Sequence, residues 1–130
     1  MPRNCLRILF AGSIALFPLA AQAAPDNTLG MALMSASVDA APSPNIIRGS
    51  GAVSASRPQT GFVDVVFDRD LSSCACTAST GYYEVGSYTG GSMASANCPY
   101  AAPNSARVIV RSENATFIDS PFHLIVFCPK

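Results

Sequence analysis

His123 is the single histidine of the chain, and any acid–base or serine-hydrolase chemistry would depend on it. An imidazole can act as general base for a serine hydroxyl when a carboxylate orients it. Serine is abundant, and the candidate carboxylate partners are Asp64, Asp68, Asp70 and Asp119. The chain contains no G-x-S-x-G sequence, however, and a lone histidine in an apolar strand is usually a hydrogen-bonded structural residue. We therefore assign no catalytic residue and predict a structural role for His123, with a small secreted hydrolase as the alternative.

The sequence Asp68-Arg69-Asp70 could hold a cation or form a turn. Calcium takes six or more oxygen ligands, so a calcium site here would need Asp64 or Asp119 in addition. In a turn, the two carboxylates instead accept local hydrogen bonds and pair with the guanidinium group of Arg69. We favour the turn with its salt bridge, and we predict neither a metal nor a cofactor.

A tyrosine-rich, glycine-rich stretch at residues 81–91 is the candidate binding surface. Tyr82, Tyr83 and Tyr88 offer flat, amphipathic rings of the kind that contact sugars or protein partners. The competing interpretation, which we favour, is that these rings pack on a sheet with their hydroxyl groups at its edge. Asn114-Ala115-Thr116 also matches a glycosylation sequon, which matters only in a host that glycosylates it.

Cysteine usage predicts two disulfides. Cys5 lies in the N-terminal segment that we expect to be removed, which leaves Cys74, Cys76, Cys98 and Cys128. An even number in a short exported chain favours disulfides, and C-x-C followed by isolated cysteines is a poor match to a zinc site. Two residues apart, Cys74 and Cys76 face the same side of a strand, where a mutual bridge is awkward, so each should pair with a distant partner. Cys74–Cys128 with Cys76–Cys98 is the preferred arrangement, and the crossed pairing is the alternative.

The elements that position these residues follow a predicted secretory signal peptide at residues 1–23. Arg3 and Arg7 give a positively charged start, residues 6–19 are almost entirely apolar, and Ala21-Gln22-Ala23 matches an A-x-A cleavage signal. The apolar run is shorter than the roughly 20 residues of a membrane-spanning helix. We expect secretion, with the periplasm as the alternative location, and no stable membrane anchor.

The charge that remains after cleavage is close to balanced. Six basic and eight acidic residues remain, and this balance lacks the excess of basic residues that is typical of nucleic-acid-binding domains. We expect a short flexible segment at residues 24–30 and a single β domain at residues 31–130.

Short strand-like runs separated by glycine and proline turns predict an all-β fold. We expect a β-sandwich or jelly-roll-like domain of about eight short antiparallel strands, with a small β-barrel as the alternative. The runs are residues 31–38, 45–56, 62–68, 73–79, 82–88, 92–98, 107–111 and 122–128.

Alternation assigns faces to several of these strands. In residues 62–68, Val63, Val65 and Phe67 share one face, and in residues 107–111 Val108 and Val110 lie opposite Arg107, Ile109 and Arg111. Residues 122–128 are apolar on both faces, which predicts a central strand covered on each side. Gly49 and Gly51 suggest a bulge or a close backbone approach within residues 45–56, rather than a break.

Several motifs resemble a family of small bacterial exported or phage-tail-associated β domains. The family's outline is a glycine, hydrophobic residues, F-D/N-R-D and S-x-C-A, closed by P-F-H-L-x-V-x-C. The corresponding residues here are 47–58, 60–61, 65–70, 73–75 and 121–128. The resemblance covers about residues 31–128 and implies a β domain with no established activity. It also implies that Cys74 pairs with Cys128, the two cysteines of the outline, which leaves Cys76 to pair with Cys98.

With no catalytic set in view, we predict a secreted, non-enzymatic binding or structural module whose partner is an extracellular ligand or a second copy of itself. The alternative is a subunit of a homotrimeric surface or tail-like assembly, in which Ile109 or Phe127 would be buried between chains.

Overall fold

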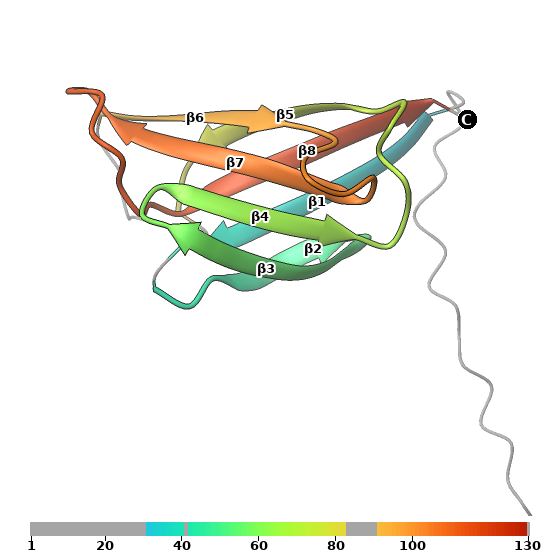
Figure 1. The fold of residues 1–130 in the computed structure, drawn as a ribbon, viewed down its shortest axis with the longest axis horizontal. Helices are drawn as coiled ribbons and strands as arrows, with labels where there is room; N and C mark the ends of the chain where they lie inside the picture. The colour runs from blue at the N-terminus through green and yellow to red at the C-terminus, as the bar shows by residue number, and fades with distance from the viewer. Residues whose placement is uncertain (1–30, 41, 83–90, 130) are drawn as a thin grey trace, which may run out of the picture.

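Eight antiparallel β-strands form two four-stranded sheets in the computed structural model, which describes residues 31–40, 42–82 and 91–129 (Figure 1). The strands are β1 (Met31–Asp39), β2 (Asn45–Ser50), β3 (Ala52–Gln59), β4 (Phe62–Phe67), β5 (Ala75–Thr80), β6 (Ser92–Asn97), β7 (Ser105–Ser112) and β8 (Phe122–Pro129). The β1/β8 sheet has the order β2-β1-β8-β5, and the β4/β7 sheet has the order β3-β4-β7-β6.

The two sheets stack face to face, with their strands crossing at an angle (Figure 1). The predicted β-sandwich is therefore confirmed, and the small-barrel alternative is wrong because the strands form two separate sheets. The predicted signal peptide, the flexible segment at residues 24–30 and most of the predicted strand at residues 82–88 lie outside the described residues. No helix that could span a lipid bilayer occurs in the described ranges.

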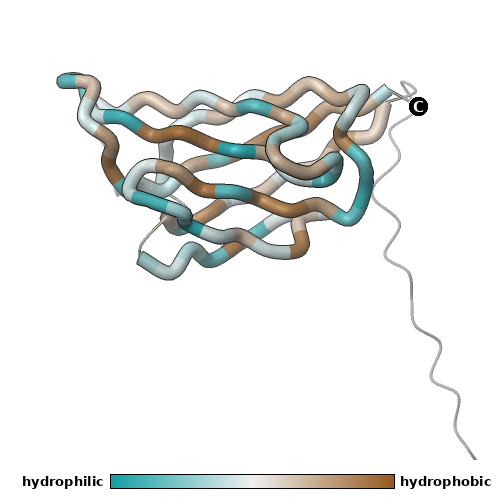
Figure 2. Tube along the Cα trace, in the orientation of Figure 1, coloured by the Kyte–Doolittle hydropathy of each residue, from teal (hydrophilic) through white to brown (hydrophobic). Residues whose placement is uncertain are grey.

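Alternating side chains supply the core between the sheets. Val63, Val65 and Phe67 of β4 are buried, as the sequence pattern predicts, and so are Val108 and Val110 of β7. Figure 2 shows this alternation as bands of opposite hydropathy along the front sheet. The β1/β8 sheet contributes the facing residues, which are Met34, Ala36, Val38, Phe122, Leu124 and Val126. Burial of these side chains is the main favourable term in the folding free energy.

Strand β8 departs from its prediction on one face. It is central, between β1 and β5, but Ile125 and Phe127 on its outer face are 37% and 38% exposed. The expectation that β8 is covered on both sides is therefore wrong for the described residues. A central strand in a two-layer sandwich has a second layer on one side only.

The chain changes sheets at Gly51, where a continuous strand is predicted. Strand β2 pairs with β1 in one sheet, whereas β3 pairs with β4 in the other. Gly51 takes a φ of 75°, which favours glycine because it has no Cβ. The prediction of no break is wrong at this residue. At Gly49 the close backbone approach is confirmed, because an added Cβ would lie 2.8 Å from the carbonyl oxygen of Ser35.

Two disulfides join the strands at one side of the sandwich. Cys74–Cys128 links the segment before β5 to the end of β8 within one sheet, with 4.2 Å between Cα atoms. Cys76–Cys98 links β5 to the residue after β6, and so joins the two sheets. The disulfide pairing preferred from the sequence is therefore confirmed. Disulfides of this kind are typical of proteins that fold in an oxidising compartment.

Candidate functional site

Strand register brings polar and aromatic residues together on the outer face of the β4/β7 sheet. Phe62 lies opposite Ile109, which lies opposite Ser95, so β4, β7 and β6 each contribute one side chain to this row. Asp64 lies opposite Arg107 in the next row. The alternation predicted for residues 107–111 correctly assigns Arg107, Ile109 and Arg111 to one face, the face opposite the core.

Arg107 is held on several sides. Its Nε and Nη2 atoms donate to the two carboxylate oxygens of Asp64 at 2.6 and 2.7 Å, and Nη1 donates to the Tyr100 hydroxyl at 2.7 Å. Its guanidinium carbon also lies 3.9 Å from the Tyr100 ring centroid and 5.8 Å from that of Phe62. The hydrogen bonds to Asp64 are the main reason why the pKa of Arg107 is raised. The guanidinium group of Arg107 is therefore held in place by Tyr100 and Asp64, and the Asp64 carboxylate balances its charge.

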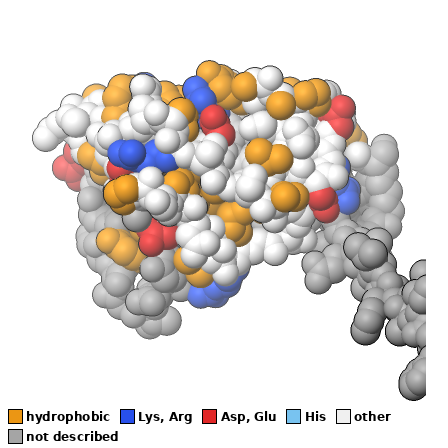
Figure 3. Space-filling view, turned by 60° about the horizontal axis from the view of Figure 1, so that its bottom comes forward, with side chains coloured by type: hydrophobic (Ala, Val, Ile, Leu, Met, Phe, Trp, Pro, Cys, Tyr) orange, Lys and Arg blue, Asp and Glu red, His pale blue; other side chains and the backbone are white. Residues whose placement is uncertain are grey.

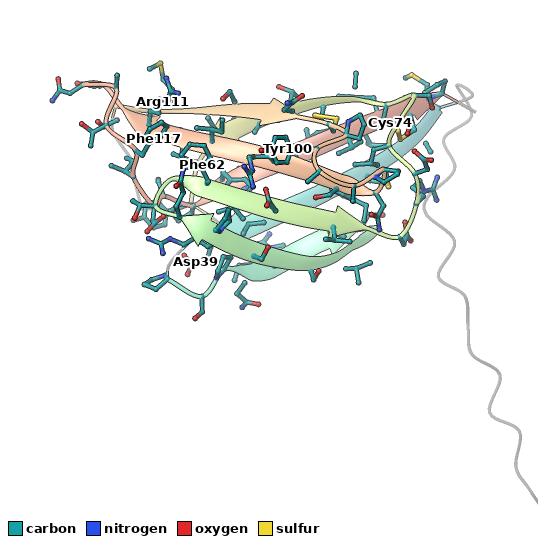
Figure 4. All side chains as sticks on the ribbon, viewed as in Figure 1. Asp39, Phe62, Cys74, Tyr100, Arg111 and Phe117 are labelled. Carbon is teal, nitrogen blue, oxygen red and sulfur yellow. A yellow bond between two sulfur atoms is a disulfide. The ribbon has the colours of Figure 1, made fainter. Side chains whose placement is uncertain are left out.

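Aromatic rings continue this arrangement toward Arg111. The ring centroids of Phe62 and Phe117 are 4.7 Å apart, and the Arg111 guanidinium carbon lies 4.6 Å from the Phe117 ring centroid. Figure 4 shows Phe62, Phe117 and Arg111 at one end of the sheet, with Tyr100 further along it. We call Tyr100, Arg107, Phe62, Phe117 and Arg111 the arginine–aromatic row. It combines a tilted ring pair, with an interplanar angle of 48°, and cation–π contacts.

A hollow of about 340 Å³ lies beside this row. We call it the Ile109 hollow; it is lined by Met93, Ala94, Ser95, Ile109 and Arg111. Met93 is 60% exposed, so part of the apolar lining faces solvent.

Arg111 differs from Arg107 because no carboxylate of the described residues forms an ion pair with it. Its position is opposite Met93 on β6 and opposite Phe117 on the other side. The hollow therefore combines an apolar floor with one guanidinium group that has no acidic partner within residues 31–40, 42–82 and 91–129.

Charge on the rest of the surface is dispersed. In the face shown in Figure 3, acidic and basic side chains lie scattered among uncharged ones and do not form a broad patch of one sign. Local contacts at the Ile109 hollow, rather than a long-range field, would decide what binds there.

His123 lies on the outer face of the opposite sheet. Its cross-strand neighbours are Ser37 and Ser79, and its imidazole lies close to Gly81, where an added Cβ would approach Nε2 to 3.0 Å. Two of the candidate carboxylate partners have other contacts: Asp64 binds Arg107 on the outer face of the β4/β7 sheet, and Asp119 binds Arg57. The structure does not bring His123 together with these two aspartates.

The Asp68-Arg69-Asp70 segment forms the predicted turn. Asp70 accepts a hydrogen bond from the backbone N–H of Ser72 at 2.7 Å, and hydrogen bonding to Ser72 lowers the pKa of its carboxyl. Arg69 lies 3.6 Å from Asp68, which is a weak ion pair. Among the described residues, no group of three or more potential metal ligands gathers here or elsewhere.

Of the three tyrosines considered for binding, the structure describes only Tyr82, which is 42% exposed. Tyr83 and Tyr88 lie outside the described residues, so the tyrosine surface stays a prediction. The sequon at residues 114–116 lies in an exposed turn after β7.

A second apolar cluster occupies the outer face of the β1/β8 sheet. Leu33 of β1 lies opposite Phe127 of β8, and the two are 39% and 38% exposed, with Ile125 beside them at 37%. Single exposed apolar residues are common on protein surfaces, but neighbouring ones are typical of contact surfaces.

Comparison of the chain with protein-family models, with curated proteins and with solved structures found no match. The function must therefore be argued from the residues themselves.

Proposed function

We propose that this protein is a secreted, disulfide-stabilised, non-enzymatic binding module that takes its ligand at the Ile109 hollow. The observation that supports this proposal is the combination, in one concave site, of partly exposed apolar side chains, chiefly Met93, with the Arg111 guanidinium group. Binding sites are typically concave and largely apolar, with a few polar groups that fix orientation. The arginine–aromatic row beside the hollow would hold Arg111 in place.

Export and family membership are parts of the same proposal. The signal-peptide pattern at residues 1–23 and the two disulfides support secretion. The motifs at residues 65–70 and 121–128 support membership of the small bacterial exported or phage-tail-associated β domains.

A fragment screen observed by NMR tests the binding proposal. Isotope-labelled, exported and oxidised protein is titrated with small molecules that include uncharged, cationic and anionic compounds. We expect the hits to shift the backbone amides of Ala94, Ser95 and Ile109. The variant Ile109→Glu should abolish those shifts, because it fills the hollow and supplies a carboxylate to Arg111. Thr77→Glu, on the opposite sheet, is the matched control and should bind like the wild type. Equal binding by both variants, or no shifts at the hollow, would overturn the proposal.

Self-association through the β1/β8 sheet is the second candidate, and the exposed cluster at Leu33, Ile125 and Phe127 favours it. In this alternative the protein is a homotrimeric subunit that buries Phe127 between chains. Sedimentation velocity at micromolar concentration tests it directly. An oligomer that Phe127→Ser dissociates would support the alternative, and a monomer at every concentration would exclude it.

The non-enzymatic part of the proposal is supported by the pairing of Asp64 and Asp119 with arginines rather than with His123. We expect His123→Gln to leave any ligand affinity unchanged and to affect stability only. A hydrolytic activity that this substitution removes would establish the hydrolase alternative instead.

A further inference from the structure

We propose that the ligand of the Ile109 hollow is a small amphiphilic carboxylate, whose apolar body lies on Ile109 and Met93 while its carboxylate pairs with Arg111. This inference rests on the proposed binding function and adds to it the chemical class of the ligand.

The structure contains its own example of a carboxylate bound on this face. Arg107 and Arg111 lie on the same side of β7, and Asp64 occupies the Nε–Nη2 edge of Arg107 with two hydrogen bonds. The guanidinium carbon of Arg111 lies over the Phe117 ring at 4.6 Å from its centroid, as that of Arg107 lies over the Tyr100 ring at 3.9 Å. A guanidinium group stacked on a ring keeps its N–H edge available for a planar, bidentate acceptor.

Among the described residues, the cross-strand neighbours of Arg111 supply no carboxylate to its guanidinium group. The cross-strand partners of Arg111 are Met93 and Phe117, neither of which can accept a charged hydrogen bond. At Arg107 the corresponding position on β4 is Asp64. The ligand would therefore do at Arg111 what Asp64 does at Arg107.

The other residues that line the hollow indicate that the ligand also has an apolar part. Ile109 and Ala94 are apolar, and Met93, at 60% exposed, has a flexible thioether chain that can fold over a bound group. An anion with no apolar part would leave this surface exposed to water. The volume of about 340 Å³ is near the lower end of the range for small-molecule sites, so the apolar body is small.

Three ligands that differ in one feature each test the inference: hexanoate, its neutral amide hexanamide, and acetate. Titrations followed by amide shifts of residues 93–95 and 109–111 give the affinities. We expect hexanoate to bind there, and both hexanamide and acetate to bind about tenfold more weakly or worse, because each lacks one of the two contacts.

Variants of Arg111 identify the group that binds the carboxylate. Arg111→Met should weaken hexanoate binding about tenfold and leave hexanamide unchanged. Arg111→Lys should be intermediate, because it keeps the charge and loses the bidentate edge. Arg48→Met, an exposed arginine substitution on the other sheet, is the matched control for net charge and should bind like the wild type.

The outcomes separate this inference from the function on which it rests. If hexanamide binds the hollow as well as hexanoate does, or if Arg111→Met binds hexanoate normally, the ligand class is wrong while the binding function stands. If hexanoate does not bind but other fragments shift the amides of the hollow, the ligand class is again wrong and the binding function stands. If neither hexanoate nor any fragment shifts these amides, both are overturned.

Discussion

Three aspartates of the described residues are each paired with one arginine, and the geometry of the pairs differs. Asp64–Arg107 and Asp119–Arg57 have contacts of 2.6 Å between side chains that are about one-fifth exposed. Asp68–Arg69 has a contact of 3.6 Å between side chains that are 40% and 37% exposed. Exposed, long ion pairs contribute little to stability, so the first two pairs should matter more.

Asp119 fixes the turn between β3 and β4 to the segment before β8. Its Oδ1 atom accepts from Arg57 Nε and from the Gly61 backbone N–H, each at 2.9 Å. We predict that Asp119→Asn lowers the free energy of unfolding by about 1–2 kcal/mol at neutral pH, because it removes the negative charge paired with Arg57 and replaces one acceptor oxygen with an amide group. Urea denaturation measures this. Asp68→Asn, the control in a weak pair, should change stability by less than half as much.

The same contacts give stability a dependence on pH. The hydrogen bond from Arg57 is the main cause of the lowered pKa of Asp119, and burial opposes it. Stability that depends on a lowered carboxyl pKa is present above the unfolded-chain value of about 3.9 and is lost as pH falls through the folded-state pKa. We predict that the wild type loses stability in this acid range and that Asp119→Asn loses less over the same range. Parallel acid profiles for the two proteins would contradict this role of Asp119.

At the scale of elements, Gly51 is the residue that allows one extended run to serve two sheets. A Cβ at this residue would lie 3.1 Å from Cγ and Sδ of Met34, and the φ of 75° disfavours any other residue. We predict that Gly51→Ala destabilises the protein by about 1–3 kcal/mol. Thermal unfolding monitored by circular dichroism tests this, with Ala52→Gly as a neighbouring control that should cost about 1 kcal/mol or less. A neutral Gly51→Ala variant would show that the backbone relaxes without cost.

The sequence predicts best the strands whose two faces differ in polarity. The buried face of β4 and the Arg107-Ile109-Arg111 face of β7 follow from period-two alternation, which one-sided burial enforces. The break at Gly51 is missed because none of residues 45–56 is fully buried, and the apolar Ile46, Ile47 and Val53 do not alternate regularly with polar residues. Without a buried face, their pattern cannot distinguish one strand from two.

The candidate site is predicted only in part, for a different reason. Alternation places Arg107 and Arg111 on one face, but Tyr100 comes from the loop after β6 and Phe117 from the segment between β7 and β8. Their convergence depends on strand register and loop conformation, which no local pattern contains. The hydrolase alternative would need a carboxylate beside His123, and in the structure Asp64 and Asp119 are instead paired with Arg107 and Arg57.

At the scale of the whole molecule, the two disulfides differ in the elements that they join and in the length of chain that they close into a loop. Cys76–Cys98 joins the sheets and closes a sequence separation of 22 residues, whereas Cys74–Cys128 joins the segment before β5 to β8 and closes a separation of 54 residues. We predict that the double variant Cys76→Ser/Cys98→Ser loses about 3 kcal/mol and that Cys74→Ser/Cys128→Ser loses about 4 kcal/mol, since the longer loop restricts the unfolded chain more. Cys128 is also 5% exposed and part of the core, which adds to its cost. Guanidinium denaturation of both variants measures the two losses of stability. A larger loss for Cys76→Ser/Cys98→Ser would contradict the prediction.

The residues that stabilise the fold are therefore distinct from the residues that form the proposed binding site. The core lies between the sheets, the Cys76–Cys98 disulfide joins the two sheets, and the Ile109 hollow lies on the outer face of the β4/β7 sheet. Substitutions at Arg111 should therefore change binding without changing the fold. This separation is what a binding module on a rigid scaffold requires.

Ligand binding at the Ile109 hollow is best measured by a crystal structure of the exported, oxidised protein grown with hexanoate. We expect the carboxylate within hydrogen-bond distance of the Arg111 guanidinium group and the hydrocarbon chain against Ile109 and Met93. Hexanoate bound at another surface, with the Ile109 hollow empty or covered by a second copy of the chain, would contradict it.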